Sequence, residues 1–461
     1  MMRCLKLAAL ALLLAGCHGS EVEPAKPSLH IPAQWRDAVG PSSAAEGFWW
    51  RNFHDAALNR YVDQALRYNS DVLTARERVN EYQARLNAAD STLWPTVDAG
   101  LNGTRSRAQS AATGLPVYST LYRGSLTASY DVDLWGGNRR AIDAAQASLE
   151  AQRAAAAAAD LTVASSVASG YLTLLSLDEQ LRVTQETLKA REEAFRLAKR
   201  QFETGYTSRL ELMQTDSELR ATRAQIPPLQ HQIASQENAL SVLLGASPGA
   251  VARGGNINAL TPLALPSQLP SSLLNRRPDI VQAERTLVAA DASLASQRAK
   301  LLPSLNLTAS TSIQDDTLAG LLDNPLRLWS IGGSILAPLL NRETLYSQVD
   351  IAMSQRNQAL YGYESTVRNA FKEVNDSLDA IGRYREQLAE LQGQVEVAQE
   401  TLRIAQNRYN NGYSSYLDVL DAQRTLFSAE LNVVQVKNNL LQAQVDLYRS
   451  LGGGWGGLAT S

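Results

Sequence analysis

Three charged residues stand close together in the segment "NNGYSSYLDVLDAQRTL" at residues 410–426. Asp418, Asp421 and Arg424 lie at i, i+3 and i+6, so adjacent members of this set face the same way if the segment is helical. Leu417 lies one helical turn before Asp421. Two carboxylates on one face attract cations, and a neighbouring arginine can bind them. The alternative is a solvated helix face, which is the usual meaning of charged residues on a helix.

Residues that could support catalysis or metal binding do not gather elsewhere in the sequence. The four histidines are scattered and suggest no metal site. The sequence has no G-x-x-x-x-G-K-S/T phosphate loop, and its serines, aspartates and histidines form no group with catalytic spacing. We therefore expect a protein that is not an enzyme and that needs no cofactor. The histidines are His18, His30, His54 and His231.

The composition excludes some classes of partner. The chain has 461 residues, a formal net charge of −3 and 45% hydrophobic residues. It can therefore bury a core, and its charge is too balanced to indicate a nucleic acid or an acidic substrate as its partner. Partners must be inferred from sequence patterns instead.

The first residues predict secretion. Arg3 and Lys6 precede the apolar run "LAALALLLAG". This run has the length and the basic flank of a secretory signal, and it is too short to be a permanent transmembrane helix. We predict that residues 1–16 are a signal peptide and are removed.

The end of this run predicts lipid attachment. Leu14-Ala15-Gly16-Cys17 is similar to the bacterial lipobox, in which the cysteine is lipidated and becomes the first residue of the mature protein. Cys4 is removed with the signal, so Cys17 has no disulfide partner. We predict that Cys17 carries palmitate, that 17–53 is a lipid-anchored N-terminal segment, and that His18, which is not the aspartate of inner-membrane retention, favours the outer membrane. The alternative is a chance cysteine beside an ordinary cleavage site.

The rest of the sequence contains an internal duplication. The tract "QFETGYTSRLELMQ" is echoed by "RYNNGYSSYLDVLD", and Gly205 and Gly412 set the offset at 412 − 205 = 207 residues. "SDVLTARERV" and "PDIVQAERTL", and "LWPTVDAGLN" and "LLPSLNLTAS", repeat at nearly the same offset. We predict a first repeat at 54–250, a linker at 251–275, a second repeat at 276–450 and a C-terminal tail at 451–461.

Apolar heptads predict long paired helices in each repeat. Apolar residues recur every seven positions from Val167 to Phe202 and from Val374 to Tyr409, one offset later. The spacing resumes after each glycine. Because 3.6 residues per turn drifts away from a straight seam, a sustained seven-residue repeat implies helices that supercoil around each other. About 65 residues precede Gly205 in this helix, which corresponds to roughly 100 Å.

Each pair of helices should meet at a tight turn. Gly205 and Gly412 are suited to the left-handed residue that ends a helix, and the serines and threonines that follow can cap the next helix. Pro227-Pro228 predicts a kink or break in the returning helix of the first repeat. The predicted hairpin tips are Gly205, Tyr206, Thr207 and Ser208 in the first repeat and Gly412, Tyr413, Ser414 and Ser415 in the second.

Alternating segments ahead of these helices predict strands. "SLNLTASTSI" and "SLTASYDVD" place apolar residues on one face and small polar residues on the other. We predict strand pairs at about 96–133 and 304–338, of a kind that suits a transmembrane barrel with a wet interior, although a soluble sandwich is the alternative. Four strands cannot close a membrane barrel, so the chain must oligomerise if these strands lie in a membrane.

These features together resemble the outer-membrane factor family, the TolC-like exit ducts of bacterial efflux and type I secretion systems. The motifs that carry the resemblance include "SYDVDLWGGNRR", "NRRPDIVQAERTL" and the two Gly-Tyr turns. The lipobox, "YLDVLDAQRTLF" and "LGGGW" place the chain closest to the lipoprotein branch that serves resistance-nodulation-division pumps. The resemblance implies a mixed α/β membrane protein: a homotrimer with four strands per chain in a twelve-stranded outer-membrane β-barrel, continuous with a periplasmic α-helical coiled-coil barrel.

The resemblance also implies a function and its partners. The chain would be the passive exit channel of a tripartite efflux system, opened by docking to a periplasmic adaptor (membrane fusion) protein and an inner-membrane pump. Leu417, Asp418, Asp421 and Arg424 would form a gate at its periplasmic end, and the two hairpin tips would meet the adaptor. The alternative is a lipid-anchored periplasmic coiled-coil scaffold without a pore.

The duplication favours the gate over a solvated helix face. Subtracting 207 maps Asp418, Asp421 and Arg424 onto Glu211, Gln214 and Ser217. Both copies keep the heptads and the turn, but the full charged set occurs in one copy. A general need for solubility would apply to both hairpins, whereas a pore-facing role would fall on one of them.

Overall fold

The chain folds into two compact units, and each helix-rich repeat contributes to both. The computed structural model describes residues 23–36, 48–260, 262–263, 265, 270–340, 342–453 and 455. The predicted signal peptide, the Cys17 lipidation site and most of the C-terminal tail lie outside the described residues. We call the units the strand unit, which contains Val79–Gln152 and Ala283–Glu364, and the helical unit, which contains Leu29–Arg78, Arg153–Gln282 and Ser365–Ser461.

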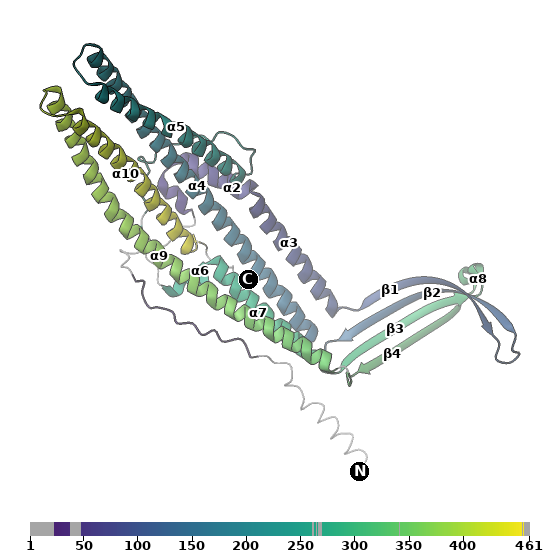
Figure 1. Ribbon diagram of the computed structural model, residues 1–461. Helices are drawn as coiled ribbons and strands as arrows, with labels where there is room; N and C mark the ends of the chain where they lie inside the picture. The colour runs from purple at the N-terminus through teal and green to yellow at the C-terminus, as the bar shows by residue number, and fades with distance from the viewer. Residues whose placement is uncertain are drawn as a thin grey trace. The chain divides into compact units, whose positions relative to one another are not determined.

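Long helices dominate the chain (Figure 1). The longest, α4 and α9, contain 67 and 69 residues, and each runs through both units. The helices are α2 (Ala56–Tyr68), α3 (Ser70–Asp90), α4 (Gly137–Glu203), α5 (Arg209–Leu243), α6 (Leu273–Arg276), α7 (Pro278–Ala299), α8 (Leu318–Asp323), α9 (Arg342–Asn410) and α10 (Tyr416–Ser450). Short 3-10 helices lie at η1 (Trp49–Phe53), η2 (Ser91–Leu93) and η3 (Pro270–Ser272).

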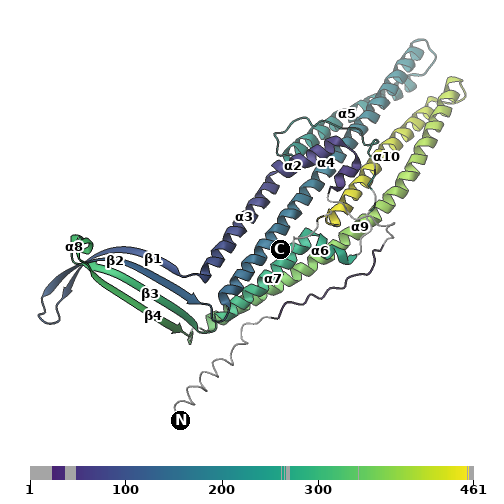
Figure 2. The same ribbon diagram turned by 180° about the vertical axis from the view of Figure 1, so that it is seen from behind.

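The strand unit contains an antiparallel sheet in the order β1-β2-β3-β4. Figure 2 shows this sheet: the β1–β2 loop and α8 lie at one end of the strands, and the connections to α3, α4, α7 and α9 lie at the other. Both edge strands, β1 and β4, are exposed along their whole length. The strands are β1 (Thr96–Gln109), β2 (Pro116–Val132), β3 (Ser304–Asp315) and β4 (Leu326–Leu336).

The register of the sheet separates an apolar face from a polar face. One row across the four strands consists of Val97, Ala128, Ala309 and Ile331, and it is entirely apolar. Because successive residues of a strand point to opposite faces, the adjacent row belongs to the other face. That row consists of Asp98, Thr127, Ser310 and Ser330, and the last two hydroxyls lie 2.9 Å apart. The alternation predicted from the sequence therefore places small polar groups on one side of the sheet.

The helical unit has its main core where α2, α4 and α10 meet the segment after α5. The Trp49 ring stacks on the Tyr448 ring of α10 with 5.6 Å between ring centres, and it makes an edge contact with Trp50 at 5.7 Å. Both tryptophans are buried. Asp55 caps α2 by accepting bonds from the amides of Ala57 and Leu58 at 2.7 and 2.9 Å. The core therefore joins the start of the first repeat to the end of the second.

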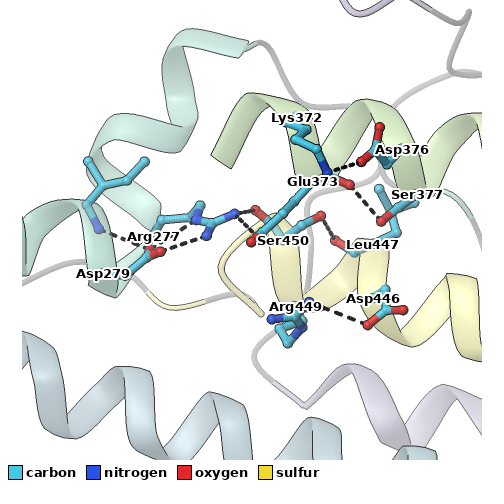
Figure 3. A network of polar contacts seen from close by, with 11 residues as sticks. Arg277, Asp279, Lys372, Glu373, Asp376, Ser377, Asp446, Leu447, Arg449 and Ser450 are labelled. Carbon is cyan, nitrogen blue, oxygen red and sulfur yellow. Dashed lines mark hydrogen bonds and ion pairs between the residues drawn. The ribbon is translucent and has the colours of Figure 1, made fainter. Parts of the chain in front are cut away.

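A second junction in the helical unit is polar (Figure 3). The buried guanidinium of Arg277 binds Asp279 beside it, reaches the Glu373 carboxylate of α9 at 2.8 Å, and donates to the Ser450 carbonyl at the end of α10 at 3.1 Å. The last carbonyls of a helix have no partner within the helix, so this bond satisfies one of them. The motif "NRRPDI" thus ties the start of α7 to α9 and α10.

Of the kink or break predicted at Pro227-Pro228, the break is wrong. Helix α5 continues from Arg209 to Leu243 with both prolines inside it. Each proline removes a bond to the carbonyl four residues earlier, at Arg223 and Ala224. These two residues and the prolines are exposed, so water can bind the freed carbonyls and the helix does not need to end.

Among the described residues, α4 is the one helix that is long and apolar enough to cross a membrane by length and composition. Half of its apolar stretch is buried inside the protein. Val167 and Leu174, on its heptad seam, are fully buried, as in the core helix of a bundle.

Candidate functional site

The two hairpin tips have the same turn. Gly205 and Gly412 adopt the predicted left-handed conformation, with φ of +78° and +76°. The Gly205 amide donates to the Phe202 carbonyl at 3.0 Å, and the Gly412 amide donates to the Tyr409 carbonyl at 2.9 Å. In each tip the next amide reaches back to the carbonyl five residues earlier, which is the Schellman arrangement that closes a helix with glycine.

The tips differ in how the following helix is capped. Ser208 caps α5, because its hydroxyl accepts a bond from the Glu211 amide at 3.2 Å. Ser415 stands at the corresponding position before α10, but its side chain makes no capping bond. Tyr206 and Tyr413 are 89% and 78% exposed. The two predicted tips therefore have the same backbone conformation and each has an exposed tyrosine, but they differ in how the next helix is capped.

The start of α10 has one buried and one exposed side. Val419 and Leu420 are buried against Ala405 of α9 and its neighbours. The four predicted gate residues lie on the exposed side: Leu417, which is 48% exposed, Asp418, Asp421 and Arg424. The structure therefore brings the predicted set together on one side of the helix.

The closest partner of Arg424 is a residue that the sequence did not suggest. Its Nε donates to Glu218 Oε1 of α5 at 3.0 Å, and its Nη2 binds the same oxygen. Asp421 Oδ1 is farther away, 3.7 Å from Arg424 Nη1. The hydrogen bonds to Glu218 raise the pKa of Arg424. Arg424 therefore joins the second hairpin to the first.

Glu218 is itself held by a second arginine. Its Oε2 lies 2.9 Å from Nη1 of Arg191 on α4, and the Glu218 side chain is only 12% exposed. Arg191 also binds Thr222 of α5 and lies 5.6 Å from the ring of Phe427 on α10. Burial lowers the pKa of Arg191, although a guanidinium remains charged in proteins. A line of alternating charges thus runs from Arg191 through Glu218 to Arg424 and Asp421.

A second link between the hairpins lies nearer the tips. The Tyr409 hydroxyl of α9 donates to the Glu211 carboxylate of α5 and lies 3.4 Å from Gln201 Oε1 of α4. Thr207 in the first tip also donates to Glu211. Burial and the Glu211 carboxylate raise the pKa of Tyr409, so the phenol keeps its proton and can serve as a donor. The adjacent ring of Tyr416 contacts Tyr409 at 5.4 Å between centres.

Comparisons with known proteins agree with this architecture. The family model described as "Outer membrane efflux protein" matches residues 61–246 and 269–453, one match in each repeat. The chain belongs to the outer membrane efflux protein family. The antibiotic efflux pump outer membrane protein ArpC of Pseudomonas putida is 33% identical over 98% of this chain and 95% of its own length.

Two further relatives of this efflux protein are informative. The probable outer membrane lipoprotein SilC of Salmonella typhimurium is 30% identical over 96% of this chain and 97% of its own length. The MtrE outer membrane channel of Neisseria gonorrhoeae, solved in its open state, has a TM-score of 0.83, is 28% identical and covers 94% of this chain and 97% of its own. The chain is therefore an outer-membrane efflux channel with a mixed α/β channel fold and an internal repeat, and it is not an enzyme.

Proposed function

We propose that this chain is the passive exit channel of a tripartite efflux system, gated at its periplasmic end by the exposed side of α10 and opened by docking to an adaptor and an inner-membrane pump. The observation that carries the proposal is the line from Arg191 through Glu218 to Arg424 and Asp421, which fixes the second hairpin against the first. Charged residues that served only solubility would not need a partner that is nearly buried. The SilC relative is named a lipoprotein, which supports a lipid anchor at Cys17.

Three copies of the chain would close the barrel. The edges of the sheet, β1 and β4, carry unpaired backbone groups along their length, which is costly in a membrane. Joining β1 of one copy to β4 of the next removes both edges, and three copies give twelve strands, enough to enclose a wet interior. Leu181, Leu388 and other heptad residues are only half-buried within one chain, so neighbouring copies would complete their packing.

In this homotrimer the α10 residues would form the gate. Leu417 would narrow the opening, and Asp418 and Asp421 would contribute six carboxylates near the threefold axis. Such a ring attracts cations, and mutual repulsion works against its closure unless arginine neutralises part of the charge. Arg424 is placed to do so, since it contacts Asp421 as well as Glu218. The open MtrE structure supports a channel with more than one state in this family.

The hairpin tips would receive the periplasmic adaptor. Tyr206 and Tyr413 are the most exposed aromatic residues of the tips, and nothing lies within 4 Å of a Cβ added at Gly205 or Gly412. An adaptor could therefore approach the backbone of each turn closely. The pump would be of the resistance-nodulation-division class, as the resemblance of the sequence implies, and it would supply the energy for transport.

Conductance in a planar bilayer tests the gate. Asp421→Ala should reduce the preference for cations, because it removes three of the six carboxylates. It should loosen closure, because each Arg424 loses its contact with Asp421. The matched control is Gln214→Ala, at the equivalent position of the first repeat, which should leave conductance and selectivity as in the wild type. Unchanged conductance and selectivity in Asp421→Ala would remove the gate assignment, and a wild-type protein that never conducts would favour the scaffold without a pore.

Export from cells tests the docking tips. Proline fixes φ near −65°, so Gly205→Pro and Gly412→Pro should each distort a turn whose φ is +78° or +76°. We expect trimers to form and pump-dependent export to be lost. Full export in both variants would exclude the tips as the docking site.

A further inference from the structure

The β1–β2 hairpin carries two arginines on the apolar face of the sheet. Arg105 and Arg107 are separated by one residue on β1, so they share a face with Val97 and Leu101. These apolar residues are exposed in the chain. In a membrane barrel the apolar face contacts lipid, so the two arginines point outward and not into the channel.

Their position along β1 corresponds to the outer boundary of the membrane. They follow Thr96 by 105 − 96 = 9 and 107 − 96 = 11 residues, or about 30 and 36 Å along the strand. A strand tilt of about 40° reduces these to heights of about 23 and 28 Å, close to an apolar band about 25 Å tall. Trp94 lies exposed at the other end of β1, and Tyr118 lies directly opposite Arg107. Aromatic residues mark both boundaries of such bands.

This end of the hairpin stands apart from the rest of the sheet. The pairing of β2 with β3 begins at Tyr122 and Asp315, so the part of β2 before Tyr122 pairs with β1 alone. Figure 1 shows the hairpin continuing past the loop that holds α8. The arginines are therefore accessible from the side of the sheet within the chain.

The hairpin gives these arginines no acidic partner. Residues 99–130 contain three arginines and no aspartate or glutamate. Arg107 lies 5.6 Å from the ring centre of Tyr118, and among the described residues neither Arg105 nor Arg107 forms an ion pair. Asp315 lies on the same face but two strands from β1, and its carboxylate accepts bonds from the Thr317 amide and hydroxyl at 2.9 and 3.0 Å.

The second repeat lacks this feature. The equivalent tracts that start at Leu93 and Leu301 set a local offset of 208, which maps Arg105 and Arg107 onto Ile313 and Asp315. The outward cations are therefore not a requirement of a strand pair in this fold. An outward arginine costs little at the membrane boundary and more toward the middle, so the pair is placed where a charged ligand can reach it.

We propose that Arg105 and Arg107, with Tyr118, bind the phosphate groups of a phosphorylated glycolipid in the outer leaflet of the membrane. The planar guanidinium forms paired hydrogen bonds with phosphate, and two such groups about 7 Å apart can hold one or two phosphates of a single headgroup. This rests on the barrel of the proposed function, in which a trimer would carry three such sites. The site would fix the barrel in the leaflet whose lipids carry phosphate.

Binding of fluorescent diphosphoryl lipid A to the detergent-solubilised full-length protein tests this site. R105Q/R107Q should bind about 30-fold more weakly than the wild type, on the expectation that each arginine contributes its usual share at an anionic lipid surface. The matched control is R123Q, which removes one arginine from the same hairpin but on the opposite face, where Arg123 donates to Ser312 Oγ at 3.1 Å. R123Q should bind lipid A as tightly as the wild type does. The affinity of R105K/R107K should lie between those of the wild type and R105Q/R107Q.

Native mass spectrometry of the same samples separates this site from the proposed function. Equal binding by R105Q/R107Q and the wild type would overturn the site, and so would a loss confined to R123Q, which would place the lipid phosphate on the channel face. Equal binding of lipid A and phosphatidylcholine by the wild type would also overturn it, since phosphatidylcholine offers no net negative charge. A wild-type protein that forms no trimer would count against the proposed function, whereas trimeric variants with altered binding report on the site alone.

Discussion

The two helical hairpins of the helical unit have the same backbone conformation at their turns. Their polar side chains differ, and the donors of one hairpin match the acceptors of the other. Both turns use a left-handed glycine and the same pair of backbone bonds. The donors of the links between the hairpins, Tyr409 and Arg424, belong to the second hairpin, and their equivalents in the first are Phe202 and Ser217. The acceptors, Glu211 and Glu218, belong to the first. The two copies therefore keep the same fold, while the first supplies the acceptors and the second supplies the donors of the contacts between them.

This division explains why the charge of α10 is not repeated in α5. Two identical hairpins would place like groups opposite each other, which would repel if charged and would lack partners if both were donors. The first hairpin supplies a buried carboxylate and the second an exposed side with a cation at its edge. Substitutions at equivalent positions of the two hairpins should therefore have unequal effects on stability and on opening.

The largest effect is expected from Glu218→Gln. It leaves the buried guanidinium of Arg191 without its countercharge, which costs about 3–5 kcal/mol for a buried pair. Hydrogen exchange measured by mass spectrometry should show faster opening of α5 and α10 next to this position. Thr425→Ala, at the equivalent position of the second hairpin, should change the free energy of opening by less than about 0.5 kcal/mol. Similar exchange in the two variants would contradict the division between the hairpins.

The next largest effect is expected from Tyr409→Phe. It removes the hydroxyl that binds Glu211, and a hydrogen bond to a charged group contributes about 1.5–3 kcal/mol. Because this bond lies between the hairpins, planar-bilayer recordings should show a larger open fraction than in the wild type. Phe202→Tyr adds a hydroxyl at the equivalent position of the first hairpin and should leave the open fraction unchanged. A wild-type open fraction in Tyr409→Phe would mean that this bond does not oppose opening.

Local patterns predicted much of the architecture. The heptads from Val167 and Val374 correspond to α4 and α9, and the two glycines lie in the left-handed conformation that their place in the turn indicated. The break predicted from Pro227-Pro228 is absent. Water can bind the exposed carbonyls that lose their helical hydrogen bonds, so continuation of the helix costs little free energy. Burial of that stretch would have made a break more favourable, and burial is not visible in a local pattern.

The contacts between hairpins could not be read from the sequence. Arg191 and Glu218 are 27 residues apart, and Glu218 and Arg424 are 206 apart, so no helical spacing relates them. The sequence directed attention to the carboxylates near Arg424, whereas the structure places its closest contact on α5. One signal was available: at the offset of 207, Tyr409 replaces Phe202 on an otherwise apolar seam. A hydroxyl gained on a seam indicates a polar partner on the neighbouring helix.

Alanine at the two turn glycines should have equal effects. An L-residue in the left-handed conformation costs about 1–2 kcal/mol, and an added Cβ meets nothing within 4 Å at Gly205 or Gly412. Gly205→Ala and Gly412→Ala should therefore each raise the rate of amide hydrogen exchange at the substituted tip, and to the same extent. A difference larger than about 0.5 kcal/mol between them would show that one turn is held by contacts beyond its backbone.

The smallest effect, and the sharpest contrast between the tips, is expected at the helix caps. Ser208→Ala removes the hydroxyl that binds the Glu211 amide and should destabilise the first turn of α5 by about 1 kcal/mol. Ser415→Ala should leave α10 nearly unchanged, since the Ser415 side chain makes no capping bond. Hydrogen exchange of the first amides of α5 and α10 measures the effects of both substitutions. Equal loss in the two variants would mean that Ser415 caps α10 in solution, and the start of the proposed gate would then be as firmly held as the tip of the first hairpin.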